Sequence, residues 1–406
     1  MYKLFEVFGV EMEYMVVDSS TLKVKSIVDE VIKEESGSYT ADVEKDDMAW
    51  SNELISHVIE FKTNGPTSSL ENLPEKFLMQ IKTVNQILAK HNAILLPSGC
   101  HPFVDPFTET KIWEHEYNEV YSLYNKIFDC RGHGWSNLQS THLNLPFAND
   151  AEFEKLHAAI RLLLPIIPAI SASSPILDGR ITGFSDSRLE VYRKNQAKIP
   201  SIAGSIIPEA VFSKQEYYDK IFNKIIEDIK PYDTDNILDH HFLNSRGAIS
   251  RFDRGAIEIR IIDIQECPLA DISILHAIIE VLKALVDEKW ISLTEQKKWD
   301  EKALLDILLS CIKFGENAKI TNKEYLGIFG IEKEEAFAKD IWKHLRSELN
   351  DKFQNRFGKV FDEILLHGTL STRIMKGLNT NYSIENMKKV YGNLSDCLHK
   401  NELYIP

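Results

Sequence analysis

Four stretches of the chain alternate between apolar and polar residues with the two-residue period of a β-strand. In residues 8–18, "FGVEMEYMVVD", Glu11 and Glu13 share one face of the predicted strand, while Val10, Met12 and Tyr14 occupy the other. The stretches "HVIEFKT", "THLNL" and "AIEIRIID" repeat the pattern, and their polar faces hold Glu60, Lys62, His142, Asn144, Glu258 and Arg260. Each strand therefore presents one apolar face and one face of side chains able to bind ligands.

Segments with apolar residues at helical spacing alternate with these strands up to about residue 290. They predict helices over residues 69–92, 117–130, 214–230 and 269–290, a short buried strand at 93–99, and a helix after residue 151 that breaks at Pro165 and Pro168. The aromatic stripe in "YNEVYSLYNKIFDC" is interpreted as core packing. From about residue 292 onward the pattern is helical almost throughout, without a Pro/Gly/Ser linker. We therefore expect a catalytic core over residues 1–290 and a helical subdomain over residues 291–406 that packs on it.

Composition narrows the class of protein. The 406 residues include 47 Lys+Arg and 61 Asp+Glu, a formal net charge of −14, which argues against a general nucleic-acid binder because such proteins need a basic footprint. Five widely spaced cysteines without a C-x-x-C motif favour a reducing compartment. The sequence shows neither a signal-peptide pattern nor an apolar run long enough to span a bilayer. We therefore expect a cytoplasmic protein that handles small molecules, without nucleic-acid or membrane partners; a homo-oligomer stays open.

The polar strand faces have two interpretations. One is the water-facing side of an antiparallel sheet, which is the usual case for a single strand. Three features favour a binding site. The residue types are Glu, His, Asn and Arg, and the stretch around Glu258 and Arg260 is so apolar that a charge there must be paired. In addition, carboxylates that are clustered on one face repel one another. One carboxylate pair at ~4 Å costs on the order of 4 kcal/mol at an effective dielectric constant of about 20. Cations must therefore lie among these side chains.

The residue types also favour certain ions and exclude common nucleotide motifs. Oxygen ligands with at most one imidazole suit Mg²⁺ or Mn²⁺ better than zinc. Glu53 precedes Glu60 by seven residues, which would place the two on opposite faces of one straight strand, so the chain must bend between them if both serve the site. There is no P-loop and no G-x-G-x-x-G motif. The phosphates of any bound ATP would therefore be neutralised by metal ions and arginines.

In these residues the chain resembles the glutamate–cysteine ligase family, among the ATP-dependent carboxylate–amine ligases related to glutamine synthetase. The likeness spans roughly residues 7–280 and rests on "FGVEMEYMVVD", "NELISHVIEFKT", "SGCHPF", "STHLNLPF", "SASSPILDGRITGFSDSR" and "GAIEIRIIDIQECP". It implies an α+β fold like that of glutamine synthetase. In that fold a curved, mainly antiparallel sheet forms a funnel, helices cover its outer face, and here a helical C-terminal region would follow.

The resemblance also implies roles for single residues. The family's metal-ligand positions fall on Glu11, Glu13, Glu53, Glu60, His142 and Glu258. Arg260 matches the arginine that contacts the transferred phosphate, so Arg260 and Glu258 are predicted catalytic residues. Many close members have H-x-H where this chain has His142-x-Asn144, and Asn144 is predicted to bind metal or nucleotide.

Three further cations complete the predicted site. Lys62 and Arg254 are predicted to contact the cofactor. Arg188, in "GFSDSR", has two interpretations of equal weight: a bidentate grip on a substrate carboxylate, as a third catalytic residue, or a structural salt bridge.

Together these features predict an ATP- and Mg²⁺-dependent (or Mn²⁺-dependent) ligase that joins a carboxylate to an amine through an acyl phosphate. Glutamate or a similar acid is the favoured acid, and cysteine or another amino compound is the amine. Two alternatives stay open: a phosphoryl transferase of the same fold acting on a small amino or guanidino compound, and a non-catalytic ligand-binding scaffold. A zinc hydrolase is disfavoured because the sequence lacks H-E-x-x-H and any multi-histidine cluster.

Overall fold

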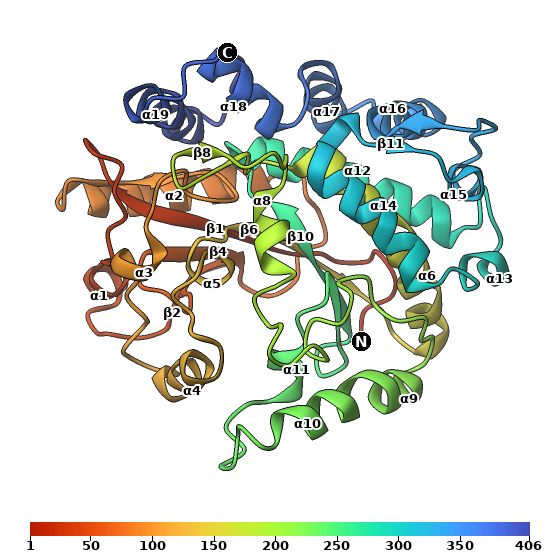
Figure 1. Ribbon diagram of the computed structural model, residues 1–406, viewed down its shortest axis with the longest axis horizontal. Helices are drawn as coiled ribbons and strands as arrows, with labels where there is room; N and C mark the ends of the chain where they lie inside the picture. Colours follow the sequence, from red (N-terminus) through yellow and green to blue (C-terminus); the bar gives the residue numbers. More distant parts are fainter.

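One eight-stranded sheet forms the centre of the computed structural model, which describes all residues 1–406 (Figure 1). The strands follow the order β2-β3-β4-β1-β6-β10-β9, β5 pairs with β1 outside this path, and every pairing is antiparallel. Their bounds are β1 (Gly9–Asp18), β2 (Asp42–Lys45), β3 (Met48–Asn52), β4 (Val58–Thr63), β5 (Ala93–Leu96), β6 (Ser140–Pro146), β9 (Ala248–Arg251) and β10 (Ala256–Asp263). The expectation of a mainly antiparallel sheet is confirmed.

Twelve helices precede residue 290: α1 (Val28–Ser36), α2 (Leu73–Ala89), α3 (Pro106–Glu109), α4 (Asn118–Phe128), α5 (His133–Ser136), α6 (Asp150–Leu163), α7 (Pro168–Ser171), α8 (Ser187–Tyr192), α9 (Lys214–Tyr217), α10 (Asn223–Ile229), α11 (His240–Leu243) and α12 (Pro268–Val286). The helix predicted over residues 214–230 is α9 and α10 joined by a π-helical turn at Tyr218–Phe222. The predicted break at Pro165 and Pro168 is a 3₁₀ turn, Leu164–Ile166, followed by α7. Ile176–Leu177 (β7) and Arg180–Ile181 (β8) form a small separate hairpin.

The C-terminal region is helical, as expected, apart from the short pair β11 (Lys319–Ile320) and β12 (Ala336–Phe337). Its helices are α13 (Leu293–Gln296), α14 (Glu301–Phe314), α15 (Lys323–Ile328), α16 (Ala338–Glu348), α17 (Arg356–His367), α18 (Leu370–Leu378) and α19 (Ile384–Lys400). One hydrophobic cluster of 92 buried residues contains side chains from both sides of residue 290. The two regions therefore share a core, and the division at residue 290 remains a prediction.

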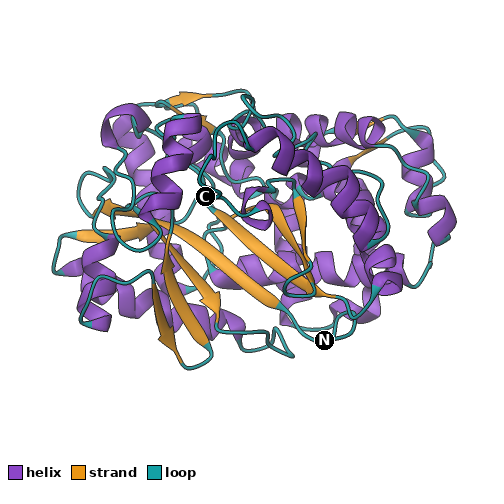
Figure 2. Ribbon diagram, turned by 90° about the horizontal axis from the view of Figure 1, so that it is seen from below, coloured by secondary structure: helices purple, strands orange, loops and turns teal.

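The apolar face of the sheet is packed against helices (Figure 2). Val10, Met12, Tyr14, Ile257 and Ile259 are 0% exposed, and α12 contacts both α2 and α6 beneath this side of the sheet. Each such aliphatic side chain gains roughly 1.5–3 kcal/mol on burial. Because side chains alternate along a strand, burying these residues forces their polar neighbours onto the opposite face.

Buried ion pairs fix both the end of β10 and the end of the chain. The side chains of Glu266 and Arg373 form an ion pair and are 0% and 1% exposed. Arg373 also donates to the backbone oxygen of Tyr404 at 3.0 Å, and the Tyr404 backbone nitrogen donates to Glu266 Oε1 at 3.0 Å. This network joins the segment after β10 to α18 and to the last residues of the chain.

Two expectations concern the chain as a whole. No cysteine forms a disulfide, as the sequence predicts. No helix combines the length and the apolar character that crossing a membrane requires.

His157 on α6 gives a test of this packing. The residue is fully buried and its ring stacks on Phe153, with centroids 5.1 Å apart. Burial, followed by the nearby charge of Arg161, lowers the pKa of His157 to about 3. In the unfolded chain the pKa of this histidine is about 6.5, so on acidification its imidazole is protonated at a higher pH in the unfolded chain than in the folded protein. The free energy of unfolding therefore decreases as the pH falls from about 6.5 towards 3.

We predict that His157→Phe removes this contribution, which amounts to roughly 2 kcal/mol at pH 5. Urea unfolding of wild type and variant at pH 7 and pH 5 measures it, with exposed His399→Gln as the control. An unchanged pH dependence in His157→Phe would show that this histidine is not buried in its neutral form.

Candidate active site

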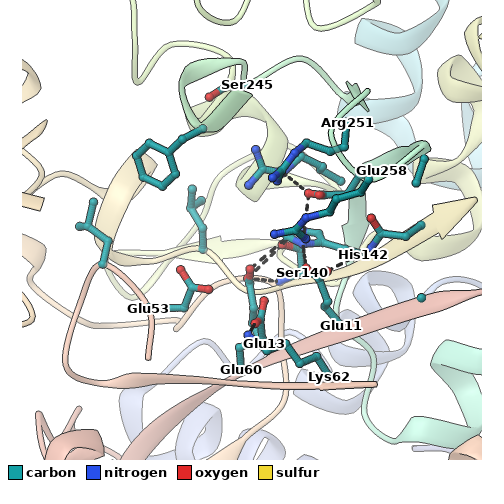
Figure 3. Close-up of a pocket in the computed structure, with 18 of the residues that line it drawn as sticks. Glu11, Glu13, Glu53, Glu60, Lys62, Ser140, His142, Ser245, Arg251 and Glu258 are labelled. Atoms are coloured by element: carbon teal, nitrogen blue, oxygen red, sulfur yellow. Dashed lines mark hydrogen bonds and ion pairs between the residues drawn. The ribbon is translucent and has the colours of Figure 1, made fainter. Parts of the chain in front are cut away.

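The polar residues of four strands meet on one face of the sheet. In the strand register, Glu11 lies opposite Lys62 on β4 and His142 on β6, Glu13 lies opposite Glu60, and Glu258 on β10 lies opposite Asn144. A cavity of about 740 Å³ covers this face and is lined by all of these residues. Figure 3 shows their side chains gathered above the strands, with Ser245 on the far side of the cavity. The sequence-based prediction of one shared polar face therefore matches the geometry.

His142 is the centre of two groups of possible metal ligands. Its Nδ1 atom lies 2.9 Å from Glu11 Oε2 and 3.8 Å from Glu258 Oε1, while its Nε2 atom lies 3.7 Å from Glu13 Oε1. The first group consists of Glu11, His142 and Glu258, and the second of Glu13, Glu60 and His142. Within each group, every residue offers one ligand atom that lies within 4.8 Å of the ligand atoms of the other two. We call these groups the two carboxylate triplets.

Hydroxyl groups hold the carboxylates in place. Glu13 Oε2 accepts hydrogen bonds from the backbone nitrogen of Ser140 at 2.7 Å and from its hydroxyl at 2.9 Å. Ser51 on β3 donates to Glu60 Oε1 at 2.6 Å. Neither serine was predicted from the sequence, although Ser140 lies two residues before His142 and therefore on the same strand face. These bonds set the direction in which each carboxylate points.

The pKa shifts show how closely the buried carboxyl groups are crowded. Burial, followed by the charge of Glu11, raises the pKa of Glu60 to about 7, even though Lys62 opposes the shift. Burial acts to lower the pKa of His142, but its hydrogen bond to Glu11 and the charges of Glu13, Glu11 and Glu258 outweigh this and raise the pKa to about 9. Without a metal ion His142 therefore favours the imidazolium form, and a metal that binds through one of its nitrogens would displace a proton. Five carboxyl groups line the cavity, and the raised pKa values of Glu60 and Glu53 show that the cations near them do not fully compensate their crowding.

The two carboxylate triplets fit a divalent cation. The donors are carboxylate oxygens with one imidazole, the set that Mg²⁺ or Mn²⁺ accepts. The raised pKa of Glu60 shows that more positive charge would be stabilised here. The residues present are thus compatible with the metal that the sequence predicts.

Glu53 occupies a different place from the other carboxylates. It follows the last residue of β3, in the connection that leads to β4, so the bend predicted between Glu53 and Glu60 is the turn between two strands. Its side chain lines the cavity, but it belongs to neither triplet, and Figure 3 shows it to one side of Glu13 and Glu60. Burial, followed by Glu13 and Glu60, raises the pKa of Glu53 well above its ordinary value. Its role as a metal ligand stays a prediction.

Arg260 reaches the cavity from an irregular part of β10. The pairing of β10 with β6 shifts between Ile259 and Ile262, a β-bulge that includes Arg260. Arg260 Nε lies 3.0 Å from Glu258 Oε1, and the Arg260 side chain is 28% exposed. The bulge thus places a guanidinium beside the first triplet with part of its surface open to the cavity.

Arg188 lines the cavity, yet its guanidinium is already engaged. Its Nε atom donates to Asp263 Oδ1 at 2.5 Å, and both side chains of this pair are at most 2% exposed. Its Nη2 atom donates to the backbone oxygen of Arg260 at 3.2 Å. Of the two interpretations of Arg188, the geometry favours the structural salt bridge, which also supports the bulge at Arg260.

The other predicted cofactor contacts have distinct surroundings. Lys62 Nζ lies 2.9 Å from Asp42 Oδ1 and 3.2 Å from Glu60 Oε1, so this lysine balances the second triplet. Asn144 Nδ2 donates to Glu11 Oε1 at 3.0 Å. Arg254 lies at the cavity rim, and its side chain is 60% exposed.

A second group of cavity residues is aromatic. Tyr121 and Tyr124 belong to the stripe that the sequence analysis interpreted as core packing. Tyr124 is indeed 3% exposed and part of the core cluster, but both tyrosines also line the cavity. Periodicity gives no sign of the second role, because it cannot show which part of a buried ring faces a cavity.

Comparison with known structures defines the class of fold. Glutamate–cysteine ligase from Francisella tularensis, solved in complex with AMP, has a TM-score of 0.59 at 11% identity and covers 97% of this chain and 89% of its own. The chain therefore shares the fold of this glutamate–cysteine ligase.

Comparison of sequences defines the family. Residues 7–309 match glutamate–cysteine ligase family 2, and the chain belongs to this family. A protein from Archaeoglobus fulgidus without an assigned function is 30% identical over 397 residues, 98% of this chain and 100% of its own. A protein from Rubrobacter xylanophilus, "Putative glutamate–cysteine ligase 2-1", is 28% identical over 190 residues, and that match spans 45% of this chain and 46%, about half, of the relative.

The buried pair of Arg188 and Asp263 gives a stability prediction. Arg188→Met leaves the Asp263 carboxylate unpaired in the core, so the free energy of unfolding should fall by about 3–5 kcal/mol. Guanidinium chloride unfolding measures this loss. Arg193→Met, in the same segment but in a more exposed pair with Glu190, should cost less than about 1 kcal/mol. A loss in Arg188→Met as small as in this control would contradict the structural role.

Proposed function

We propose that this protein is an ATP-dependent carboxylate–amine ligase. The observation that carries the proposal is the pair of carboxylate triplets that share His142 and lie beside Arg260 in one cavity. Membership of glutamate–cysteine ligase family 2 supports it. The complex of the Francisella protein with AMP supports an adenine nucleotide as the cofactor.

The residues that would hold divalent ions are Glu11, Glu13, Glu60, Glu258 and His142. Bound Mg²⁺ or Mn²⁺ would neutralise phosphate oxygens and the charge that develops as a phosphoryl group moves. Ser140 and Ser51 keep the carboxylates in position before any ligand arrives. Such preorganisation avoids the cost of reorienting charged groups during the reaction.

In the first step, an oxygen of the substrate carboxylate forms a bond to the γ-phosphorus of ATP. The bond from that phosphorus to the β,γ-bridging oxygen breaks, which gives an acyl phosphate and ADP. The chain contributes position and charge rather than a covalent group. Arg260 supplies a permanently charged guanidinium for the transferred phosphoryl group. Its backbone is fixed by the bond from Arg188 and by its own bond from N–H to the Gly247 oxygen at 2.9 Å.

In the second step, the amine nitrogen attacks the acyl carbon. A C–N bond forms, the C–O bond to the phosphate breaks, and inorganic phosphate leaves with the electron pair. The amine arrives as an ammonium ion, which the carboxylates of the cavity attract. Its proton passes to a cavity carboxylate or to the departing phosphate before the amide is complete.

The candidate substrates are inferred from the family and its named relatives. The family name and the name of the Rubrobacter relative favour glutamate as the acid and cysteine as the amine. A phosphoryl transferase that acts on a small amino or guanidino compound is the second candidate. It would use the same triplets and Arg260 and stop after the first step.

Release of ADP separates these candidates. We expect the protein, with ATP, Mg²⁺ and pairs of one acid and one amine, to release ADP and phosphate only when both substrates are present. Mass spectrometry should find a product equal to the sum of the two substrates less one water. ADP formed with a single acceptor, together with a stable phosphorylated product, would overturn ligation in favour of phosphoryl transfer. Absence of nucleotide binding would leave only the scaffold interpretation.

Glu258 gives a test of the metal site. Glu258→Gln keeps the size of the side chain but removes one anionic ligand, so we expect Mn²⁺ affinity, measured by electron paramagnetic resonance, to fall on the order of 10–100-fold. ADP release should fall with it, while circular dichroism and unfolding stay close to wild type. Glu280→Gln, a buried glutamate of α12 outside the cavity, is the matched control. Equal Mn²⁺ affinity of wild type, Glu258→Gln and Glu280→Gln would show that the metal binds elsewhere and not at Glu258.

A further inference from the structure

The cavity has an aromatic side that the ligation mechanism leaves unused. It is formed by five rings, which we call the aromatic wall: Tyr121, Tyr124, Trp135, Tyr192 and Phe242. The Tyr124 ring packs edge-on against Trp135 and against Phe242, with centroids 5.3 Å apart in both cases. These three residues come from α4, α5 and α11, so tertiary packing joins separate segments into one surface.

Parts of this wall are open. Phe242 is 45% exposed, and Tyr121 and Trp135 are half-buried. Leu54 and Leu138, which also line the cavity, are half-buried as well. Covering apolar surface gains roughly 25 cal/mol per Å², and rings add specific edge and face contacts. A ligand with an apolar body would therefore gain affinity here that a small polar ligand would not.

The aromatic wall extends from the rim formed by Arg251 and Arg254 towards the opposite end of the cavity. Phe242 lies nearer the rim, because its neighbour His241 lies 3.9 Å from Asp253, which pairs with Arg251. Arg251 and Arg254 flank the turn between β9 and β10, and the register places Ala256 at that turn opposite Pro146. Tyr121 belongs to the other end, because Asn52 Nδ2 donates both to its hydroxyl at 3.2 Å and to the Glu53 backbone oxygen at 2.9 Å. The arginine end suits the phosphates of a nucleotide. The end that holds Tyr121 is left for a substrate.

The charges at the end that holds Tyr121 select against a carboxylate. Arg188 is engaged by Asp263 and Arg260 lies against Glu258, so neither guanidinium is free of a carboxylate partner. Glu13 and Glu53 place two acidic side chains at this end of the cavity. An ammonium group, in contrast, is attracted both by this pair of acidic groups and by the faces of the rings. The surroundings thus favour a cation with an apolar body.

We propose that the aromatic wall binds the amine substrate, and that this substrate is a primary amine with an aromatic or branched apolar body and no carboxylate. The inference rests on the proposed ligase function and deepens it, because it replaces cysteine with a hydrophobic amine as the preferred nucleophile. Phe242 is the specificity-determining residue that the structure offers for testing, since its exposure makes truncation compatible with folding.

Binding is measured first, without chemistry, by calorimetry with the full chain. Phenethylamine should bind at least about tenfold more tightly than ethylamine, which lacks the ring, and than phenylalanine, which adds a carboxylate. Phe242→Ala should weaken phenethylamine binding about tenfold. Phe107→Ala is the matched control, because Phe107 is 63% exposed on the four-residue helix α3 and does not line the cavity. It should bind phenethylamine as wild type does.

Turnover with ATP, Mg²⁺ and glutamate is measured next, with phenethylamine or cysteine as the amine. Preference for phenethylamine, lost in Phe242→Ala, is the expected result. Preference for cysteine or phenylalanine would overturn the inference while the ligase function stands. If Phe242→Ala weakened ATP binding but not amine binding, the inference would also be overturned, because the aromatic wall would then hold the nucleobase. Tight phenethylamine binding that depends on Phe242, without ADP release from any pair, would uphold the amine site and refute the ligase function.

Discussion

Repulsion among buried carboxylates is the constraint on which this site depends. Glu11, Glu13, Glu60 and Glu258 project from three strands of one sheet, and Glu53 joins them from the connection before β4. At distances of ~4 Å each pair costs on the order of 4 kcal/mol at an effective dielectric constant of about 20. His142, Lys62 and Arg260 offset part of this cost, and hydroxyls of Ser51 and Ser140 offset more. The raised pKa of Glu60 shows that this compensation is incomplete, and a divalent ion or an ammonium group would stabilise the carboxylates further.

The opposite face of the same sheet provides the stability that holds these charges together. Val10, Met12 and Ile259 are fully buried against helices, and each contributes burial energy without any polar requirement. Strand β10, which carries Glu258 and Arg260, is fixed near its end by two buried ion pairs, Arg188 with Asp263 and Arg373 with Glu266. Replacing one partner of a buried pair is costly. The orientation of Arg260 is therefore protected by contacts that never touch a ligand.

The cavity joins three environments: an arginine rim, a carboxylate floor and an aromatic wall. Phosphates, divalent ions and apolar groups each find their chemical counterpart in a different part of the same space. A ligase needs this arrangement because it must hold a polyanion, a carboxylate and an amine at once. Segments from α4, α5, α8 and α11 supply the wall, so substrate preference can differ among proteins that share the sheet and its carboxylates.

Alternation along the strands was readable from the sequence. It predicted which side of each strand is buried and which side carries Glu11, Glu13, His142 and Glu258, because a period of two residues leaves no other choice once the apolar face is in the core. Helical periodicity gave the long helices α2 and α12 within a few residues. The resemblance of the motifs to a family supplied the curved antiparallel sheet.

Contacts between distant segments were decided only by tertiary structure. Arg188 lies 75 residues from Asp263, and no local pattern marks the two as partners. The separation of Glu53 from both triplets follows from a turn whose path spacing alone cannot give. Tyr121 and Tyr124 of the aromatic wall were interpreted as core packing because rings that face a cavity and rings that face a core have the same periodicity. The sequence by itself thus determined the two faces of each strand, a local property of backbone geometry, whereas partners and cavity walls depended on how far-apart segments pack in three dimensions.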